Sequence, residues 1–160
     1  MTLLTQVILP LLLLASPFLT VFILVNKVNP DNLSYKFAMA LALISAFLLI
    51  WVNLAVGIIG SEDNDANLMF VSILAFGLVG AIKVRFRSLG MSYVMLLLSV
   101  SHIVVACLDL IFQFGSKGPI WPFDVLGASL IFAILWFCSA LLFRRSAQIQ
   151  YFDEIRGIES

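Results

Sequence analysis

Long apolar segments alternate with short polar connections along almost the whole chain. Crossing the hydrocarbon of a membrane takes about 20 apolar residues in a helix. Five segments satisfy this length, roughly residues 3–25, 37–60, 68–84, 91–114 and 124–143. The connections are rich in Asn, Asp, Gly, Ser and Pro, as turns require. The pattern predicts an all-α fold, a polytopic transmembrane helix bundle with five spans.

The first apolar segment is expected to be a retained helix rather than a cleaved signal peptide. It lacks a basic region at its start, and its apolar run is longer than a signal peptide uses. Pro10 and Pro17 each offer a position for a bend in this helix.

The composition agrees with lipid as the main surroundings. Hydrophobic residues make up 62% of the chain and charged residues 11%, with a mean hydropathy of +1.13. Soluble domains are about half apolar and about a quarter charged. The formal net charge is zero, so the overall charge gives no indication of nucleic-acid binding. One His and two Cys are too few for a Cys/His zinc cluster or a disulfide framework.

Residues 1–143 are predicted to form one transmembrane bundle, and residues 144–160 a tail. In the tail, Ile149, Phe152 and Ile155 recur every three residues with charges between them. Two alternatives stay open for this tail. It is expected to continue the fifth helix past Arg144 and Arg145, and either lies on the membrane surface with its basic start on anionic lipid or is solvated and frayed.

Basic residues predict the orientation of the bundle. Eight of the nine Lys and Arg residues fall on one side of the predicted spans: Lys27, Lys36, Lys83, Arg85, Arg87, Arg144, Arg145 and Arg156. Because such residues gather on the cytoplasmic side, the N-terminus is expected outside and the C-terminus in the cytoplasm. The opposite side carries most of the carboxylates.

Small residues recur at helical spacing and are expected to let helices approach closely, because helices in lipid associate by packing and hydrogen bonds. They are Ala38, Ala42 and Ala46 in the second span, Gly77, Gly80 and Ala81 in the third, and Ser129 and Ala133 in the fifth.

An acidic turn, "SEDNDAN", separates the second and third spans and has two interpretations. Asn64, Asp65 or Asn67 could cap the next helix and complement its dipole. Alternatively, oxygens of Glu62, Asp63, Asp65 and Asn67, with Asn64, could bind Ca²⁺ or Mg²⁺ weakly. The turn begins like an EF-hand loop but has leucines where that loop needs Gly and its final Glu. It is therefore not an EF-hand.

The segments "WVNLAVGIIGSEDNDANLMF" and "GLVGAIKVRFRSLGM" resemble a family of small bacterial inner-membrane proteins. The family has a four-helix unit and the segment A-V-G-I-I-G-S-E-D-N-x-A-N-L-M, and the resemblance covers roughly residues 40–105. Asp65 stands where the family pattern has Pro, which favours the capping interpretation. The resemblance implies a bacterial inner membrane and makes the first helix an addition to the four-helix unit. It implies no activity.

Among the few ionisable or amide side chains deep within the predicted spans, three are functional candidates, because an ionisable group there costs about 2.5–3.5 kcal/mol. They are Asn53, His102 and Asp109. His102 and Asp109 lie two helical turns apart on one face, and all three are expected to point inward. In one interpretation Asn53 bonds to His102 across helices, with Asp109 solvated near the interface. In the other, the three belong to a cation or proton path below the acidic turn.

The sequence leaves three classes of function. The leading one is a non-enzymatic accessory, assembly or partner-binding subunit that acts with another membrane protein or as a homo-oligomer. The second is a small transporter or channel component with an acidic outer mouth. The third is a haem- or lipid-dependent enzyme around His102. Enzyme functions are disfavoured on two grounds. Ser99, Ser101, His102 and Asp109 share one helix, along which His102 and Asp109 are ~10 Å apart, too far for a Ser–His–Asp relay. A single His cannot supply bis-His haem ligation, although His102 with a Met could in principle bind haem.

Overall fold

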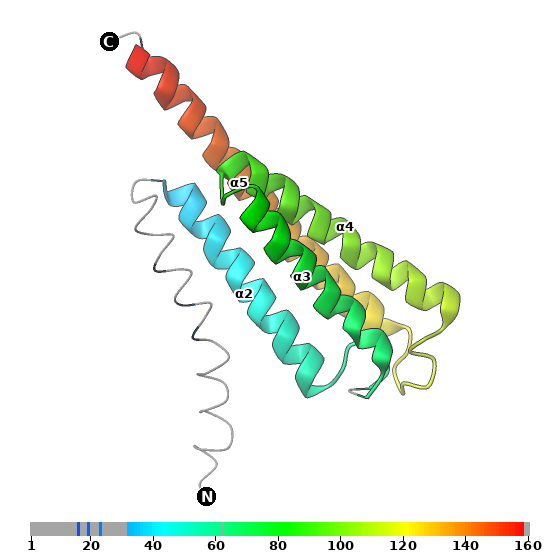
Figure 1. The fold of residues 1–160 in the computed structure, drawn as a ribbon. Coiled ribbons are helices and arrows are strands. Elements are labelled where there is room, and N and C mark those ends of the chain that lie inside the picture. Colours follow the sequence, from blue (N-terminus) through cyan, green and yellow to red (C-terminus); the bar gives the residue numbers. More distant parts are fainter. Residues whose placement is uncertain (1–15, 17–18, 20–22, 24–31, 62, 159–160) are drawn as a thin grey trace, which may run out of the picture.

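The computed structural model describes residues 16, 19, 23, 32–61 and 63–158. The helices within these residues lie side by side (Figure 1). They are α2 (Leu33–Ala55), the short 3₁₀ turn η2 (Asp65–Asn67), α3 (Leu68–Lys83), α4 (Ser88–Phe112) and α5 (Phe123–Ile158). In this described part the fold is all-α. Four helical segments are long and apolar enough to cross a membrane, namely α2, η2 with α3, α4 and α5.

The predicted first span, residues 3–25, lies almost wholly outside the described residues. The part of the chain that the structure describes therefore has four candidate spans rather than five.

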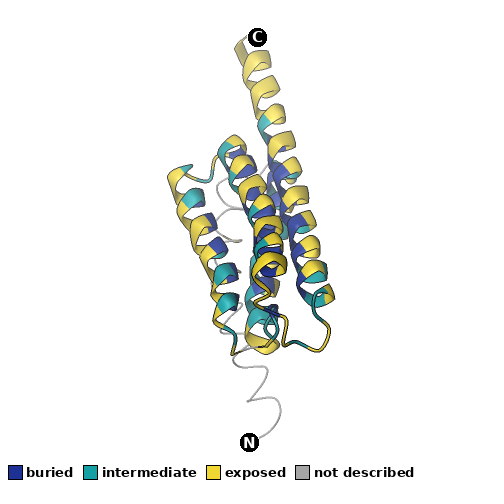
Figure 2. Ribbon diagram, turned by 90° about the vertical axis from the view of Figure 1, so that its right-hand side faces the viewer, coloured by how far each residue is buried: buried dark blue, intermediate teal, exposed yellow. Residues whose placement is uncertain are grey.

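Burial follows the pattern of a bundle in lipid. Exposed residues cover the outer faces of the helices, and buried residues face inward (Figure 2). Large apolar side chains remain on the outer faces, with Phe76 75% exposed and Ile111 70% exposed. An apolar exterior of this extent fits contact with a lipid bilayer.

A heptad pattern of buried residues joins α4 to α5. On each helix these residues recur in alternating steps of four and three, which is the spacing of a left-handed helix pair. They are Ser88, Ser92, Met95, Ser99, His102, Ala106 and Asp109 on α4, and Val125, Ser129, Phe132, Trp136, Ser139, Phe143 and Ser146 on α5. Many of these residues are serines, whose small side chains allow a close approach. Ser99 Oγ, for example, donates to the Ala133 carbonyl at 2.8 Å.

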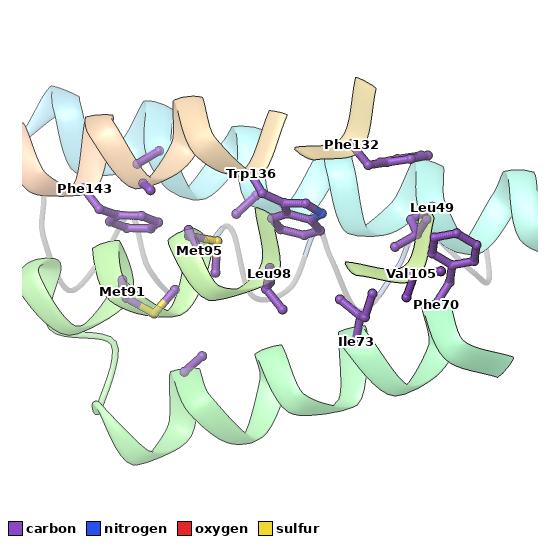
Figure 3. Close-up of a cluster of buried hydrophobic side chains, with 14 of the residues drawn as sticks. Leu49, Phe70, Ile73, Met91, Met95, Leu98, Val105, Phe132, Trp136 and Phe143 are labelled. Carbon is purple, nitrogen blue, oxygen red and sulfur yellow. The ribbon is translucent and has the colours of Figure 1, made fainter. Parts of the chain in front are cut away.

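The other two helices pack on this pair through small residues, as predicted. Ser139 Oγ donates to the Ala38 carbonyl at 2.9 Å, which brings α2 onto α5. On α3, a Cβ atom added at Gly77 would lie 2.9 Å from Leu98 Cδ1 of α4. The large core side chains fill the space between these contacts, with Trp136 of α5 next to Met95 and Leu98 of α4 (Figure 3).

The end of α2 corrects the predicted second span. The apolar run predicted a helix over residues 37–60, but α2 begins at Leu33 and ends at Ala55. Gly57 and Gly60 adopt positive φ angles of 71° and 73°, which glycine accepts without steric cost. Ile58 and Ile59 are buried although they belong to a loop. Their burial explains why the apolar pattern continued beyond the helix.

The last helix extends beyond the predicted tail boundary. α5 runs without a break from Phe123 to Ile158, which makes 36 residues. At ~1.5 Å per residue this length is about 54 Å, whereas the hydrocarbon core is about 30 Å thick. The C-terminal part of α5 projects beyond the other helices (Figures 1 and 2). Residues 144–158 therefore continue α5 as one unbroken helix.

Candidate functional site

A buried carboxylate organises the connection between α4 and α5. Asp109 is 0% exposed. Its Oδ1 accepts a hydrogen bond from the Gly115 N–H at 2.8 Å, and its Oδ2 accepts one from Trp121 Nε1 at 2.7 Å. Gly115 fits because an added Cβ would lie 2.9 Å from Trp121 Cδ1. The expectation that Asp109 is solvated is therefore wrong, because the loop folds over it.

The buried Asn67 side chain organises the connection between α2 and α3 in a similar way. Its Oδ1 accepts from the Ile58 N–H at 3.0 Å and from the Ile59 N–H at 2.8 Å. Its Nδ2 donates to the Ser61 carbonyl at 2.6 Å. Because buried backbone N–H groups need partners, this single side chain makes the burial of Ile58 and Ile59 possible. Its oxygen is already used twice inside the loop, which leaves it poorly placed as a cation ligand.

Asn64 joins the two connections. Its Oδ1 accepts from the Ala66 N–H at 3.0 Å and caps the η2 turn that leads into α3, whereas Asn67, the N-cap residue of α3 itself, makes no side-chain cap hydrogen bond. Its Nδ2 donates to the Phe114 carbonyl at 2.9 Å in the other connection. Glycines allow the two backbones to meet, since a Cβ added at Gly118 would lie 3.0 Å from Gly60 Cα. The two loops therefore form one unit at this end of the bundle.

The remaining acidic residues of the turn lie on the surface of this unit. Asp63 and Asp65 are exposed, and Glu62 lies outside the described residues. Among the residues that the structure describes, no three His, Cys, Asp or Glu side chains come close enough together to hold a metal ion.

Asn53 lies close to the loop unit rather than near His102. It is in the last turn of α2, and its Nδ2 donates to the Asn67 carbonyl at 3.3 Å. Its Oδ1 is buried and has no hydrogen-bond partner. The predicted hydrogen bond between Asn53 and His102 is therefore absent from the described structure.

His102 lies in an aromatic environment in the middle of α4. Its Nδ1 lies 2.9 Å from the Leu98 carbonyl, and its Nε2 is buried with no partner. The ring centroids of Phe70, Phe132 and Trp136 lie 5.6, 5.8 and 6.4 Å from that of His102. Since both oxygens of Asp109 bind loop donors, the structure shows no hydrogen bond from Asp109 to His102. The three predicted polar residues thus occupy separate environments instead of forming one pocket.

An apolar groove between α2 and α3 is a feature that the sequence reasoning did not predict. It contains two cavities of about 330 and 340 Å³, which share Ile50, Leu74 and Leu78 as lining residues. Small residues leave this space open: Ala42 and Ala46 on α2, and Gly77 and Ala81 on α3. All four were expected to bring helices together, and Gly77 does so toward α4 while it also lines the groove. The spacing of small residues could have suggested the groove, but it could not distinguish a contact from a gap.

The opposite end of the bundle is basic. Tyr35 OH donates to the Phe86 carbonyl at 2.7 Å, and the hydroxyls of Ser88 and Ser146 lie 3.0 Å apart. These contacts bring the start of α2, the α3–α4 turn and the middle of α5 together. The basic residues that this end collects are Lys36, Lys83, Arg85, Arg87, Arg144 and Arg145.

The α3–α4 turn holds a hollow of about 550 Å³, whose lining includes Lys83, Arg85 and Arg87. Arg85 and Phe86 have positive φ angles of 51° and 56°. Three cations are thus concentrated on one tight turn.

Comparison with known proteins adds no family to this description. No family model matches the chain, and neither a curated protein nor a solved structure matches it. The resemblance seen around residues 40–105 therefore identifies no family.

Proposed function

We propose that this multi-pass protein is a non-enzymatic accessory or assembly subunit of a bacterial inner membrane, and that it acts by binding a partner. In this proposal the acidic end faces outward and the C-terminus of α5 projects into the cytoplasm. The basic residues at one end of the bundle support this orientation.

The observation that carries the proposal is the projecting part of α5. Phe152 is 62% exposed and Ile158 is 79% exposed, and both lie beyond Arg144 and Arg145. A continuous helix that carries large apolar side chains beyond the bundle offers a surface for helix docking. Tyr151 and Ile155 lie on the same side, at spacings of four and three residues with Ile158.

The polar interior supports a structural rather than a catalytic protein. Asp109 and Asn67 each use their side-chain oxygens to close loops. His102 packs among aromatic rings. These contacts favour architectural roles for Asp109, Asn67 and His102.

The test is the mass of the complex formed by the full chain, extracted from its native membrane in mild detergent. We expect a stoichiometric partner, either another protein or a second 17.7 kDa copy, that is lost in Phe152→Glu. Gln148→Glu adds the same charge at an exposed position of the same segment and should retain the partner. A wild-type protein that is always a lone monomer, or equal binding by both variants, would contradict the proposal.

A further inference from the structure

We propose that the α2–α3 groove holds an acyl chain of an anionic phospholipid whose headgroup lies against the basic α3–α4 turn. This proposal concerns a different surface from the projecting part of α5 and does not depend on a protein partner.

The groove has the chemistry of an acyl-chain site. The cavity nearer the basic end is lined only by apolar side chains and glycine, and Trp136 of α5 and Leu98 of α4 contribute to its wall. Ala42, Ala46 and Gly77 keep it open because their side chains are small or absent. Apolar side chains cannot orient a polar ligand, whereas a hydrocarbon chain needs no hydrogen bonds.

The basic turn supplies a headgroup site next to this groove. Phe86 lines the groove, and its two neighbours, Arg85 and Arg87, line the basic hollow on the same turn. Lys83 is also exposed there, and none of the three cations forms an ion pair with a described residue. Guanidinium groups bind phosphate with paired hydrogen bonds, so this turn is complementary to a phosphodiester.

The turn is held in place rather than loosely extended. The Phe86 N–H donates to the Ala81 carbonyl at 3.1 Å, and the Arg87 N–H donates to the Val84 carbonyl at 3.1 Å. Tyr35 OH bonds the turn to α2, which forms the other wall of the groove. Headgroup and chain sites therefore keep a fixed relation to each other.

Charge favours a lipid over a protein segment as the occupant. The apolar segment at residues 3–25 of this chain contains no Asp or Glu. It could fill an apolar groove but would leave the cations at the turn without an anion. An anionic phospholipid satisfies both parts of the site at once. With the basic end toward the cytoplasm, this lipid belongs to the inner leaflet.

Trp136 provides a probe inside the groove. The full chain in nanodiscs would receive either phosphatidylglycerol or phosphatidylcholine with brominated acyl chains, which quench tryptophan on contact. The signal of Trp136 is the difference between wild type and Trp136→Phe. We expect brominated phosphatidylglycerol to reach half-maximal quenching at a severalfold lower mole fraction than brominated phosphatidylcholine.

Two variant pairs assign the parts of the site. Arg85→Gln with Arg87→Gln should remove the preference for phosphatidylglycerol, whereas Arg144→Gln with Arg145→Gln, which removes the same charge at the same end, should keep it. Ala46→Phe should reduce quenching by both lipids because it fills the groove. Leu78→Phe, at an exposed position on the wall, gives a second groove variant, and circular dichroism checks that each variant is folded.

Three results would overturn the proposal. Equal quenching by the two lipids would remove the headgroup site. A preference that falls equally in both arginine pairs would reflect only the overall charge of this end. A Trp136 that neither lipid quenches would show that a chain segment or a second copy fills the groove.

Discussion

Asp109 is a buried carboxylate with both oxygens bonded to loop donors. In Asp109→Asn the new amide group would face either the Gly115 N–H or Trp121 Nε1, so one donor would lose its acceptor. Hydrogen bonds to charged groups contribute roughly 1.5–3 kcal/mol, and we expect a loss of stability of that order. Thermal unfolding in detergent would measure it.

Asp124→Asn is the matched control for Asp109. The Asp124 carboxylate accepts from the N–H of its own neighbour, Val125, at 2.8 Å, so its loss should change stability little. A cation path through Asp109 predicts a different result. An Asp109→Asn protein with wild-type stability and altered cation flux into liposomes would support the path and contradict the loop role.

Substitutions of His102 test whether this residue serves the packing of the bundle centre or a chemical role. His102→Ala should lower the unfolding free energy by roughly 2–5 kcal/mol, because it leaves a cavity between aromatic side chains. His102→Phe should be close to wild type, because it keeps a ring and removes the buried Nε2 that has no partner. The midpoint of thermal unfolding compares the three proteins. Equal losses in both variants would show that the imidazole nitrogens matter more than its shape.

At the scale of helices, the close approach of α3 and α4 at their turn requires a glycine. A Cβ at Gly90 would lie 2.5 Å from Val84 Cβ, which is too close for two carbon atoms. Gly90→Ala should therefore destabilise the protein by about 1–3 kcal/mol, as overpacking does. Thermal unfolding in detergent again measures the change.

Gly127 in α5 is the control for this substitution. A Cβ added there meets nothing within 4 Å, so Gly127→Ala should raise stability by about 0.5–1 kcal/mol through helix propensity alone. If Gly90→Ala behaved like Gly127→Ala, the turn would not be packed as described.

The orientation of the whole molecule can be read by labelling from each side of the membrane. Cys107 and Cys138 are free and exposed, so replacing both with Ser gives a background for new cysteines. Ser61→Cys should react with a membrane-impermeant reagent from outside, and Gln148→Cys only after the cytoplasmic side is opened. The reverse pattern would invert the orientation and place the basic end outside.

Several features of the chain could be predicted from local sequence because they follow from local requirements. In lipid, a run of about 20 apolar residues must satisfy its backbone hydrogen bonds within itself, so each described span is a helix. The basic residues lie at one end of the bundle because two spans separate each basic segment of the chain from the next. The cap formed by Asn64 also follows from a local rule.

The tertiary structure decided where apolar residues stop being helical and what each polar residue does. The apolar run predicts that Ile58 and Ile59 are helical, yet the Asn67 side chain, nine and eight residues further along, holds them in a loop. Asp109 and His102 share one helix face. The Asp109 carboxylate accepts hydrogen bonds from a loop, whereas the His102 imidazole packs against aromatic rings from two other helices. In the sequence, the alanines and glycines at helical spacing in α2 and α3 are compatible with either a close helix contact or an open groove. Helix formation in lipid depends on neighbours in sequence, whereas these roles depend on contacts between segments that only the folded chain brings together.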